Sequence, residues 1–280
     1  MKIYKSHEMK EFSNMKVGGS AKELIVIEEK SEIVEALKGR DKVFLIGNGT
    51  NTLLSDEFMD VSFISLKNLK KVEDLGDGLV RAEAGIDFDD FIEYMKENDY
   101  SGLENLAGIP GSLGGLVYMN GGAYGTEIFD CIEEVEIVDE NHEIRTLKRD
   151  EIHFTYRKTE IQQKKWIVLS TTFKFQKGYD EARVEELKEK RGGNHPLDLP
   201  NLGSTFKNPE GHYSARLIIE AGMQGKRVGG AQISMVHPNF IVNHGDAKAS
   251  DIKELIAEVK KEVKKHSGID LEEEIIVVGE

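Results

Sequence analysis

Short apolar runs separated by polar or glycine residues dominate the first third of the chain. The runs at 23–29, 42–47, 61–66 and 78–85 predict β-strands, because short apolar runs bounded by turn residues are typical of strands. Residues 31–39 predict a helix with a serine cap and a glycine stop. A second, amphipathic helix is predicted from apolar residues at helical spacing: Phe88, Phe91, Ile92 and Met95. This order predicts β-α-β organisation with mixed sheet content.

The second half of the chain repeats this mixture. Strands are predicted at 131–139, 166–175, 231–236, 239–243 and 274–279, and a helix at 215–222. A long helix is predicted at 250–268, with an apolar stripe formed by Ile252, Leu255, Ile256, Val259 and Val263. Between these groups, residues 180–200 combine a charged helix with two glycines and two prolines, which predicts a domain boundary.

Composition narrows the class of protein. At 280 residues the chain is long enough for two or three domains, and no apolar run approaches the length of a membrane span. The polar N-terminus lacks the core of a signal peptide, and the single cysteine, Cys131, fits a reducing cytoplasm. The net charge of −14 argues against nucleic acid or an anionic membrane as partner. We therefore expect a cytoplasmic protein, without an obligatory protein partner.

One segment departs from the acidic average. From Lys188 to Arg227 there are seven Lys or Arg and four Asp or Glu, a local balance of +3. Such a cationic segment can arise by chance, and it is also what a site for a phosphorylated small molecule would need.

Two glycine-rich segments are candidates for binding a phosphate. The first, "IGNGTNTLL", follows a predicted strand, and the second, 108–125, holds seven glycines in eighteen positions around Ser112. Glycines let backbone N–H groups approach an anion, although the spacing matches neither a P-loop nor a Rossmann fingerprint. Two such loops closing over one diphosphate would bind a dinucleotide. The alternative is a pair of tight packing turns.

Seven segments together carry a resemblance to a known family. They are "SNMKVGGSA" (13–21), "IGNGTNTLLSD" (46–56), "GIPGSLGGLVYMNGGAYG" (108–125), "YRKTE" (156–160), "LGSTFKNP" (202–209), "VGGAQISMVHPNFIVN" (228–243) and "EEIIVVGE" (273–280). In this order they resemble the UDP-N-acetylenolpyruvoylglucosamine reductase family, within the flavoproteins of the vanillyl-alcohol-oxidase type. The resemblance runs from end to end and is to the family's shorter form.

The resemblance implies an α+β fold: a two-lobed FAD-binding domain of the PCMH type and an α+β substrate-binding domain. The implied parts are 1–60 with the strand at 269–280, then 61–180, and a substrate-binding domain at 186–268. It also implies noncovalent FAD as cofactor, NADPH as co-substrate and an enolpyruvyl UDP-sugar as substrate.

Three side chains match the family's catalytic positions. Ser204 matches the proton donor to the substrate carbon, Arg157 the residue that binds the substrate carboxylate, and Glu274 the C-terminal acid. Each has a plainer alternative: a turn residue for Ser204, a surface charge for Arg157, and a place in the solvated run 272–274 for Glu274. Ile276 stands where the family has a polar residue, and His195 where it more often has glutamine.

Further residues follow from the same matches. The candidates for binding FAD are Gly47, Asn48, Gly49, Thr50, Asn51, Gly111, Ser112, Gly114, Gly115, Asn120, Gly122, Ala123, Gly230 and Gln232. The candidates for binding the substrate are Tyr156, Lys190, Arg191, Lys207, Asn208 and Arg216. Asn239 and Asn243 are either structural or on the substrate side. The eight histidines are scattered, so we expect no metal site.

Two other functions stay open at this stage. One is a different FAD-dependent oxidase or dehydrogenase of the same superfamily. The other is a regulatory protein that binds flavin or UDP-sugar without catalysis.

Overall fold

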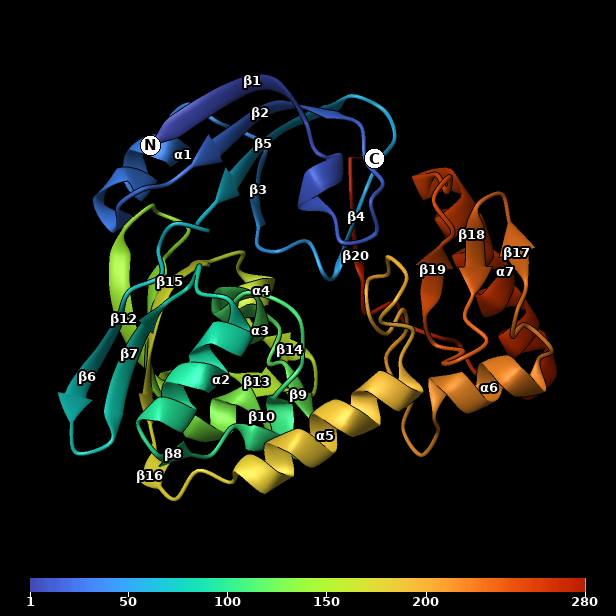
Figure 1. Ribbon diagram of the computed structural model, residues 1–280. Coiled ribbons are helices and arrows are strands. Elements are labelled where there is room, and N and C mark those ends of the chain that lie inside the picture. Colours follow the sequence, from blue (N-terminus) through green and yellow to red (C-terminus); the bar gives the residue numbers. More distant parts are fainter. Residues whose placement is uncertain (280) are drawn as a thin grey trace. The chain divides into compact units, whose positions relative to one another are not determined.

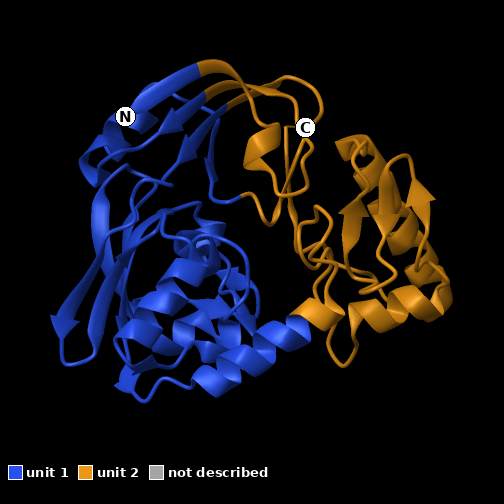
Figure 2. Cartoon of the chain, in the orientation of Figure 1, with its two compact units in different colours: residues 1–4, 24–48, 62–191 blue, residues 5–23, 49–61, 192–280 orange. Residues whose placement is uncertain are grey.

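The computed structural model describes residues 1–279, which form two compact units (Figure 2). Unit 1 comprises 1–4, 24–48 and 62–191, and unit 2 comprises 5–23, 49–61 and the chain from 192 onward. The chain passes for the last time from unit 1 to unit 2 inside helix α5 (Glu181–Asn194), which lies in the charged stretch where the sequence predicts a boundary. The finer division at 60, 180, 186 and 268 stays a prediction.

Unit 1 is built on a five-stranded antiparallel sheet with the strand order β12-β11-β15-β7-β6 (Figure 1). Its strands are β6 (Val72–Gly76), β7 (Leu79–Glu83), β11 (Ile132–Val138), β12 (Ile144–Lys148) and β15 (Ile167–Lys174). The central strand, β15, is buried along all but its last residue, and its Thr171 lies opposite Val135 on one side and Ala82 on the other. The central strand of this sheet is therefore part of the hydrophobic core of unit 1.

Helices α2 (Phe88–Glu97) and α3 (Leu113–Tyr118) lie beside this sheet (Figure 1). The apolar face predicted for α2 is confirmed, since all four of its apolar residues are buried. Ring packing shows how it is anchored, with the Phe91 centroid 5.2 Å from that of Phe173 on β15. The Asp87 carboxylate caps the helix by accepting a hydrogen bond from the Asp89 N–H (3.1 Å).

The first predicted helix is shorter than expected and begins differently. A 3-10 turn, η2 (Lys30–Glu32), precedes α1 (Ile33–Leu37). The serine cap is wrong: the Glu32 carboxylate accepts from the Glu28 N–H (2.8 Å) and the Glu29 N–H (3.2 Å) at the start of this turn, while Ser31 lies within it. β3 (Val43–Ile46) pairs in parallel with β5 (Met59–Ser65), in the sheet ordered β1-β2-β5-β3.

Unit 2 contains an antiparallel sheet that packs against helix α7, which in turn contacts α6 (Figure 1). The strands are β17 (Arg227–Val228), β18 (Ala231–Ile233) and β19 (Ile241–Asn243), and the helices are α6 (Ser214–Glu220) and α7 (Ala249–Ser267). All five residues of the predicted apolar stripe of α7 are buried, and Gly268 ends the helix in a left-handed conformation. Separately, β20 (Ile276–Val278) pairs in parallel with β4 (Thr52–Leu54).

Several strands have no counterpart among the predicted elements. The longest of them are β1 (Lys2–Glu8), β6 and β12, and each of these three lies at the edge of its sheet. Their residues are mostly exposed, with no regular alternation of buried and exposed positions. An edge strand without a buried face leaves little hydrophobic pattern to recognise.

The remaining elements are short, apart from β2 (Ser20–Val26). The helical ones are η1 (Lys10–Phe12), η3 (Glu104–Leu106), η4 (Ile128–Cys131), η5 (Arg149–Glu151) and α4 (Glu160–Gln163). The strands are β8 (Tyr100–Ser101), β9 (Gly122–Ala123), β10 (Thr126–Glu127), β13 (Phe154–Thr155), β14 (Lys158–Thr159) and β16 (Gln176–Lys177). None of the described helices has both the length and the apolar composition that a membrane crossing requires.

Candidate active site

The glycine-rich segment 108–125 packs tightly against the end of strand β7 in unit 1. The N–H of Leu113 donates to Ile86 O (2.9 Å) and the N–H of Gly114 to Ala84 O (2.8 Å). A Cβ on Gly114 would lie 2.6 Å from the Cβ of Ala84, which no real contact allows. Packing within the protein therefore requires a glycine at this position, in agreement with the alternative in which the glycine-rich segments are tight packing turns.

The two glycine-rich loops meet within unit 1. A Cβ on Gly47 would lie 2.5 Å from Ser112 Oγ, so only a glycine leaves room for that hydroxyl. Ser112 is buried and caps α3 by accepting from the Gly115 N–H (3.3 Å). Beside them, Asn48 Nδ2 donates to Asp87 Oδ2 (2.7 Å). The structure thus brings together the predicted FAD residues Gly47, Asn48, Ser112 and Gly115.

Asp87 was not among the predicted site residues. Its carboxylate both caps α2 and holds the side chain of Asn48. The available signal was its place immediately before the amphipathic run of α2, which marks a helix cap but says nothing of the neighbouring loop.

The first loop continues into unit 2 at Gly49. Gly49 has a φ of +63°, and a Cβ there would lie 1.9 Å from the carbonyl oxygen of Phe12. The Asn14 N–H donates to Gly49 O (3.0 Å), so the segment 13–21 of the resemblance supports this loop. After Thr50 and Asn51 the chain enters β4.

Arg157 lies in the two-residue turn of the β13–β14 hairpin. The strand pairs Phe154–Thr159 and Thr155–Lys158 leave Tyr156 and Arg157 at the turn, where Arg157 adopts a φ of +56°. Its guanidinium donates to Gly122 O (2.7 Å) and Asn120 O (3.3 Å) and lies 5.0 Å from the ring centre of Tyr156. The hairpin therefore carries Arg157 to the end of the glycine-rich segment.

Asn120 is fully buried beside this arginine and also has a positive φ, +50°. Its Nδ2 donates to Glu127 Oε2 (2.8 Å) and to Thr155 O (3.1 Å), which fixes the orientation of the amide. Its Oδ1 is buried and has no partner in the described part of the chain. A buried acceptor left unsatisfied costs about 1–3 kcal/mol, so this oxygen indicates a donor that the protein itself does not supply.

Ser204 and Glu274 both belong to unit 2 and lie on adjacent segments. The Glu274 N–H donates to Thr205 O (2.8 Å), and Phe206 and Glu273 form an antiparallel bridge. The neighbouring acids are in ion pairs, Glu272 with Lys207 (2.6 Å) and Glu273 with Lys260 (2.8 Å). Since Arg157 belongs to unit 1, the convergence of all three catalytic candidates stays a prediction.

The cationic segment divides between the two units. In unit 1, Lys190 and Arg191 lie over the ring of Tyr124, at 5.1 and 5.2 Å from its centre. Arg191 is buried, its Nε has no partner among the described residues, and this burial lowers the pKa of its guanidinium. Its Nη2 donates to Asn105 O (3.4 Å), and its role toward a substrate stays a prediction.

In unit 2 the cations are largely neutralised by the protein. Lys207 pairs with Glu272, and the exposed Arg216 pairs with Glu220 (2.7 Å). Asn208 Oδ1 accepts from the Ser214 N–H (3.0 Å) at the start of α6. Their role toward a substrate stays a prediction.

The other predicted FAD residues are held by local packing. A Cβ on Gly122 would lie 2.6 Å from Thr126 O, across the pairing of Ala123 with Thr126. A Cβ on Gly230 would lie 2.3 Å from the backbone nitrogen of Ala247. Gln232 bonds His244 (2.8 Å) in unit 2. Gly111 has a φ of +146°.

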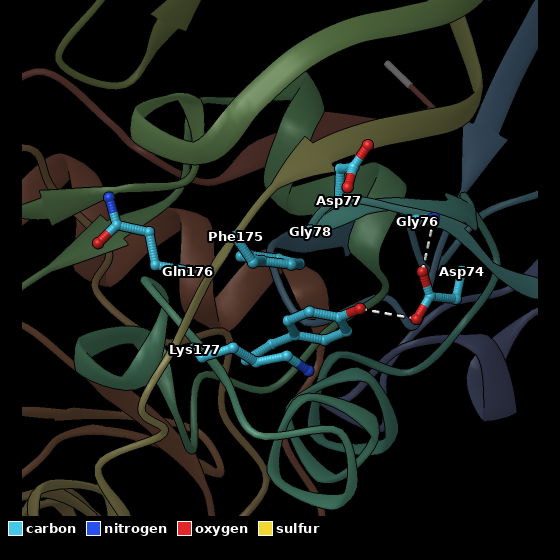
Figure 3. A pocket seen from close by; sticks show the side chains of 8 residues that line it. Asp74, Gly76, Asp77, Gly78, Phe175, Gln176 and Lys177 are labelled. Carbon is cyan, nitrogen blue, oxygen red and sulfur yellow. Dashed lines mark hydrogen bonds between the residues drawn. The ribbon is translucent and has the colours of Figure 1, made fainter.

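A hollow of about 390 Å³ in unit 1 contains none of the predicted site residues (Figure 3). It is lined by Asp74, Gly76, Asp77, Gly78, Tyr100, Phe175, Gln176 and Lys177. The Tyr100 hydroxyl and the Asp74 carboxylate in this hollow are hydrogen-bonded to each other (2.6 Å). This bond raises the pKa of Tyr100 to about 12. Within residues 1–279, no three His, Cys, Asp or Glu side chains are grouped to hold a metal ion.

Comparisons with known proteins agree along the whole chain. Residues 195–278 match the model of the C-terminal domain of UDP-N-acetylenolpyruvoylglucosamine reductase, and residues 26–148 match that of an FAD binding domain. A UDP-N-acetylenolpyruvoylglucosamine reductase from Fusobacterium nucleatum subsp. nucleatum is 55% identical over 280 residues, covering 99% of this chain and 100% of its own. One from Caldanaerobacter subterraneus is 39% identical, covering 100% and 94%.

A solved structure has the same fold. The crystal structure of UDP-N-acetylenolpyruvylglucosamine reductase (MurB) from Thermus caldophilus matches with a TM-score of 0.85 and 32% identity. The match covers 99% of this chain and 98% of that one. The α+β fold expected from the sequence is confirmed.

Proposed function

The chain belongs to the UDP-N-acetylenolpyruvoylglucosamine reductase family, whose members are FAD-binding oxidoreductases of peptidoglycan precursor synthesis, and we propose which of its residues carry out each part of the reaction. The substrate is the enolpyruvyl ether of UDP-N-acetylglucosamine, and the product is UDP-N-acetylmuramate. NADPH is the reductant. A hydride and a proton add across the carbon–carbon double bond, giving the lactyl ether.

The residues of unit 1 fit a bound FAD. The buried, unpartnered Oδ1 of Asn120 calls for a donor, and Gly47 is exposed where the two glycine-rich loops meet at Ser112. Gly47, Asn48, Ser112 and Asn120 would hold the cofactor. When bound, FAD supplies to the terminal vinyl carbon the hydride that NADPH provides.

Arg157 holds the substrate carboxylate. Negative charge builds on this carboxylate while the hydride adds, so a planar guanidinium strengthens its contact as the reaction proceeds. Two main-chain carbonyls already orient the group, and a guanidinium has five N–H donors with which to bind both these oxygens and a carboxylate.

Ser204 donates the proton to the carbon beside that carboxylate, and Glu274 assists it. The observation that carries this assignment is the 2.8 Å hydrogen bond from Glu274 N to Thr205 O, which keeps the two segments adjacent. General acid catalysis requires such fixed placement.

The direct test is to mix the purified protein with NADPH and the enolpyruvyl UDP-sugar. NADPH oxidation should depend on the sugar, and each NADPH consumed should yield one UDP-N-acetylmuramate by mass spectrometry. NADPH oxidation unaffected by the sugar, with turnover of an alcohol or hydroxy acid instead, would favour another oxidase or dehydrogenase of the superfamily. The cytoplasmic location stays a prediction.

A further inference from the structure

A single side chain holds the main chain just after Ser204. Asn239 Nδ2 donates to Phe206 O (2.8 Å), while the Phe206 N–H donates to Asn239 Oδ1 (3.0 Å). The Thr205 N–H donates to the backbone oxygen of Asn239 (2.7 Å). Asn239 is 4% exposed, so water does not compete for these bonds. Asn239 thus makes the hydrogen bonds to the main chain of Thr205 and Phe206 that a neighbouring strand would otherwise make.

The segment 272–274, which precedes β20, holds the opposite edge of the same segment. Glu274 N donates to Thr205 O (2.8 Å) and Lys207 N donates to Glu272 O (2.9 Å). The segment 205–207 is therefore bonded on one edge to Asn239 and on the other to residues 272–274. The position of Ser204 relative to Glu274 depends on both edges.

Asn51 holds Glu274 from a third direction. Asn51 Nδ2 donates to Glu274 O (3.0 Å), and the Ile276 N–H donates to Asn51 O (2.9 Å). The parallel pairing of β4 with β20 begins at the next residue, with Ile276 opposite Thr52. Asn51 thereby connects the end of the first glycine-rich loop to the Glu274 backbone.

We infer that Asn239 and Asn51 are positioning residues for the protonation step, an inference that rests on the proposed function. Asn239 fixes the Ser204 segment and Asn51 fixes Glu274, so that donor and acid keep a set spacing. This changes the interpretation of Asn51, which the sequence assigns to FAD. Misplacing a reacting group by about 1 Å can cost on the order of 100-fold in rate, so the loss of either amide should be visible.

Asn243 provides a matched control. It is equally buried, at 2% exposed, and its Nδ2 donates to Met15 O (2.9 Å) while its Oδ1 accepts from Gly245 N (2.7 Å). Neither of these bonds reaches the segment 204–207 or the segment 272–274. The sequence leaves Asn239 and Asn243 unseparated, and their contacts separate them.

The experiment compares Asn239→Ala, Asn51→Ala and Asn243→Ala with the wild type by anaerobic stopped-flow, after FAD content and Tm are measured. The reductive half-reaction is FAD reduction by NADPH, and the oxidative half-reaction is reoxidation by the enolpyruvyl UDP-sugar. Asn239→Ala and Asn51→Ala should slow only the oxidative half, by about 10- to 100-fold. Asn243→Ala should lower Tm without this selectivity.

Asn239→Asp keeps the acceptor for Phe206 N–H and should give an intermediate oxidative rate, which decides the case if Asn239→Ala does not fold. Equal slowing of both halves, or the same pattern in Asn243→Ala, would overturn the inference. Weaker FAD binding by Asn51→Ala with a normal oxidative rate at saturating FAD would make Asn51 a cofactor ligand only. A wild type that is not reoxidised at all would instead overturn the proposed function.

Discussion

The backbone N–H of Glu274 donates a 2.8 Å hydrogen bond to the carbonyl oxygen of Thr205, the residue that follows Ser204. Two segments far apart in the sequence are joined here by main-chain bonds, which do not depend on which side chains they carry. The side chains at 204 and 274 can therefore be changed while the segments stay together. This makes the assigned roles accessible to single substitutions.

Ser204→Ala should leave FAD reduction by NADPH nearly intact and slow the oxidative half-reaction by about 100- to 10,000-fold, the range typical of general acid catalysis. The alanine removes the proposed proton donor and leaves the hydrogen bonds of Thr205 in place. Anaerobic stopped-flow absorbance measures each half separately.

The matched control is Ser267→Ala, since Ser267 Oγ donates to Val263 O (2.8 Å) and accepts from the Ile269 N–H (3.3 Å) at the end of α7. It undergoes the same chemical change and should keep both rates. If Ser204→Ala impairs both half-reactions equally, the serine is structural and the assigned role fails.

Arg157→Lys should slow the oxidative half-reaction by roughly 10- to 100-fold. A lysine cannot hold the carbonyls of Asn120 and Gly122 and also present a planar fork to a carboxylate, and losing one charged hydrogen bond costs about 1.5–3 kcal/mol. The measurement is the dependence of the reoxidation rate on substrate concentration. An unchanged rate and an unchanged half-saturating concentration would refute carboxylate binding by Arg157.

Gly49→Ala should destabilise the protein far more than Gly211→Ala. Both residues have positive φ, +63° and +72°, so an alanine costs about 1–2 kcal/mol of backbone strain at either. Only at Gly49 would the new Cβ meet backbone, 1.9 Å from Phe12 O, whereas nothing lies within 4 Å at Gly211. Overpacking adds about 1–3 kcal/mol or more.

Urea denaturation with saturating FAD compares these two variants. Equal losses of unfolding free energy would mean that the Phe12 contact does not constrain this loop.

Acidification should destabilise the protein through His237. Burial lowers the pKa of this imidazole below its usual 6.5, and its Nδ1 accepts from the Asn239 N–H (3.3 Å), which only an unprotonated nitrogen can do. The unfolded chain therefore binds this proton at a higher pH than the folded chain. The contribution is complete above pH 6.5 and is lost as the pH falls through the lower folded pKa.

His237→Asn keeps an acceptor and should flatten this part of the pH dependence. NMR titration of the ring together with denaturation at several pH values measures the effect. Parallel stability curves for wild type and variant would contradict it.

The regular elements of the fold were largely predictable, because their side chains alternate between core and surface. Helix α7 and its stripe from Ile252 to Val263 follow directly from periodicity, as does α2. Edge strands such as β1 were not predictable, because most of their residues are exposed. The serine pattern does not predict the cap of the first helical turn, because the Glu32 carboxylate supplies it by accepting from the N–H groups of Glu28 and Glu29.

The candidate site was also predictable only in part. The motifs identified Ser204, Arg157 and Glu274, but not what holds them. Asn239 bonds Phe206 across a separation that no local pattern encodes, and Asp87 reaches Asn48 only because two loops meet. Several glycines that suggested a ligand, Gly114 among them, are required by contacts within the protein.

The most direct test of the account is made on the wild-type protein without oxygen. The bound FAD is reduced with one equivalent of NADPH, and the enolpyruvyl UDP-sugar is then added while the flavin absorbance is followed. We predict rapid return of the oxidised spectrum and formation of one UDP-N-acetylmuramate per FAD. A flavin that stays reduced in the presence of the sugar would contradict the proposed function.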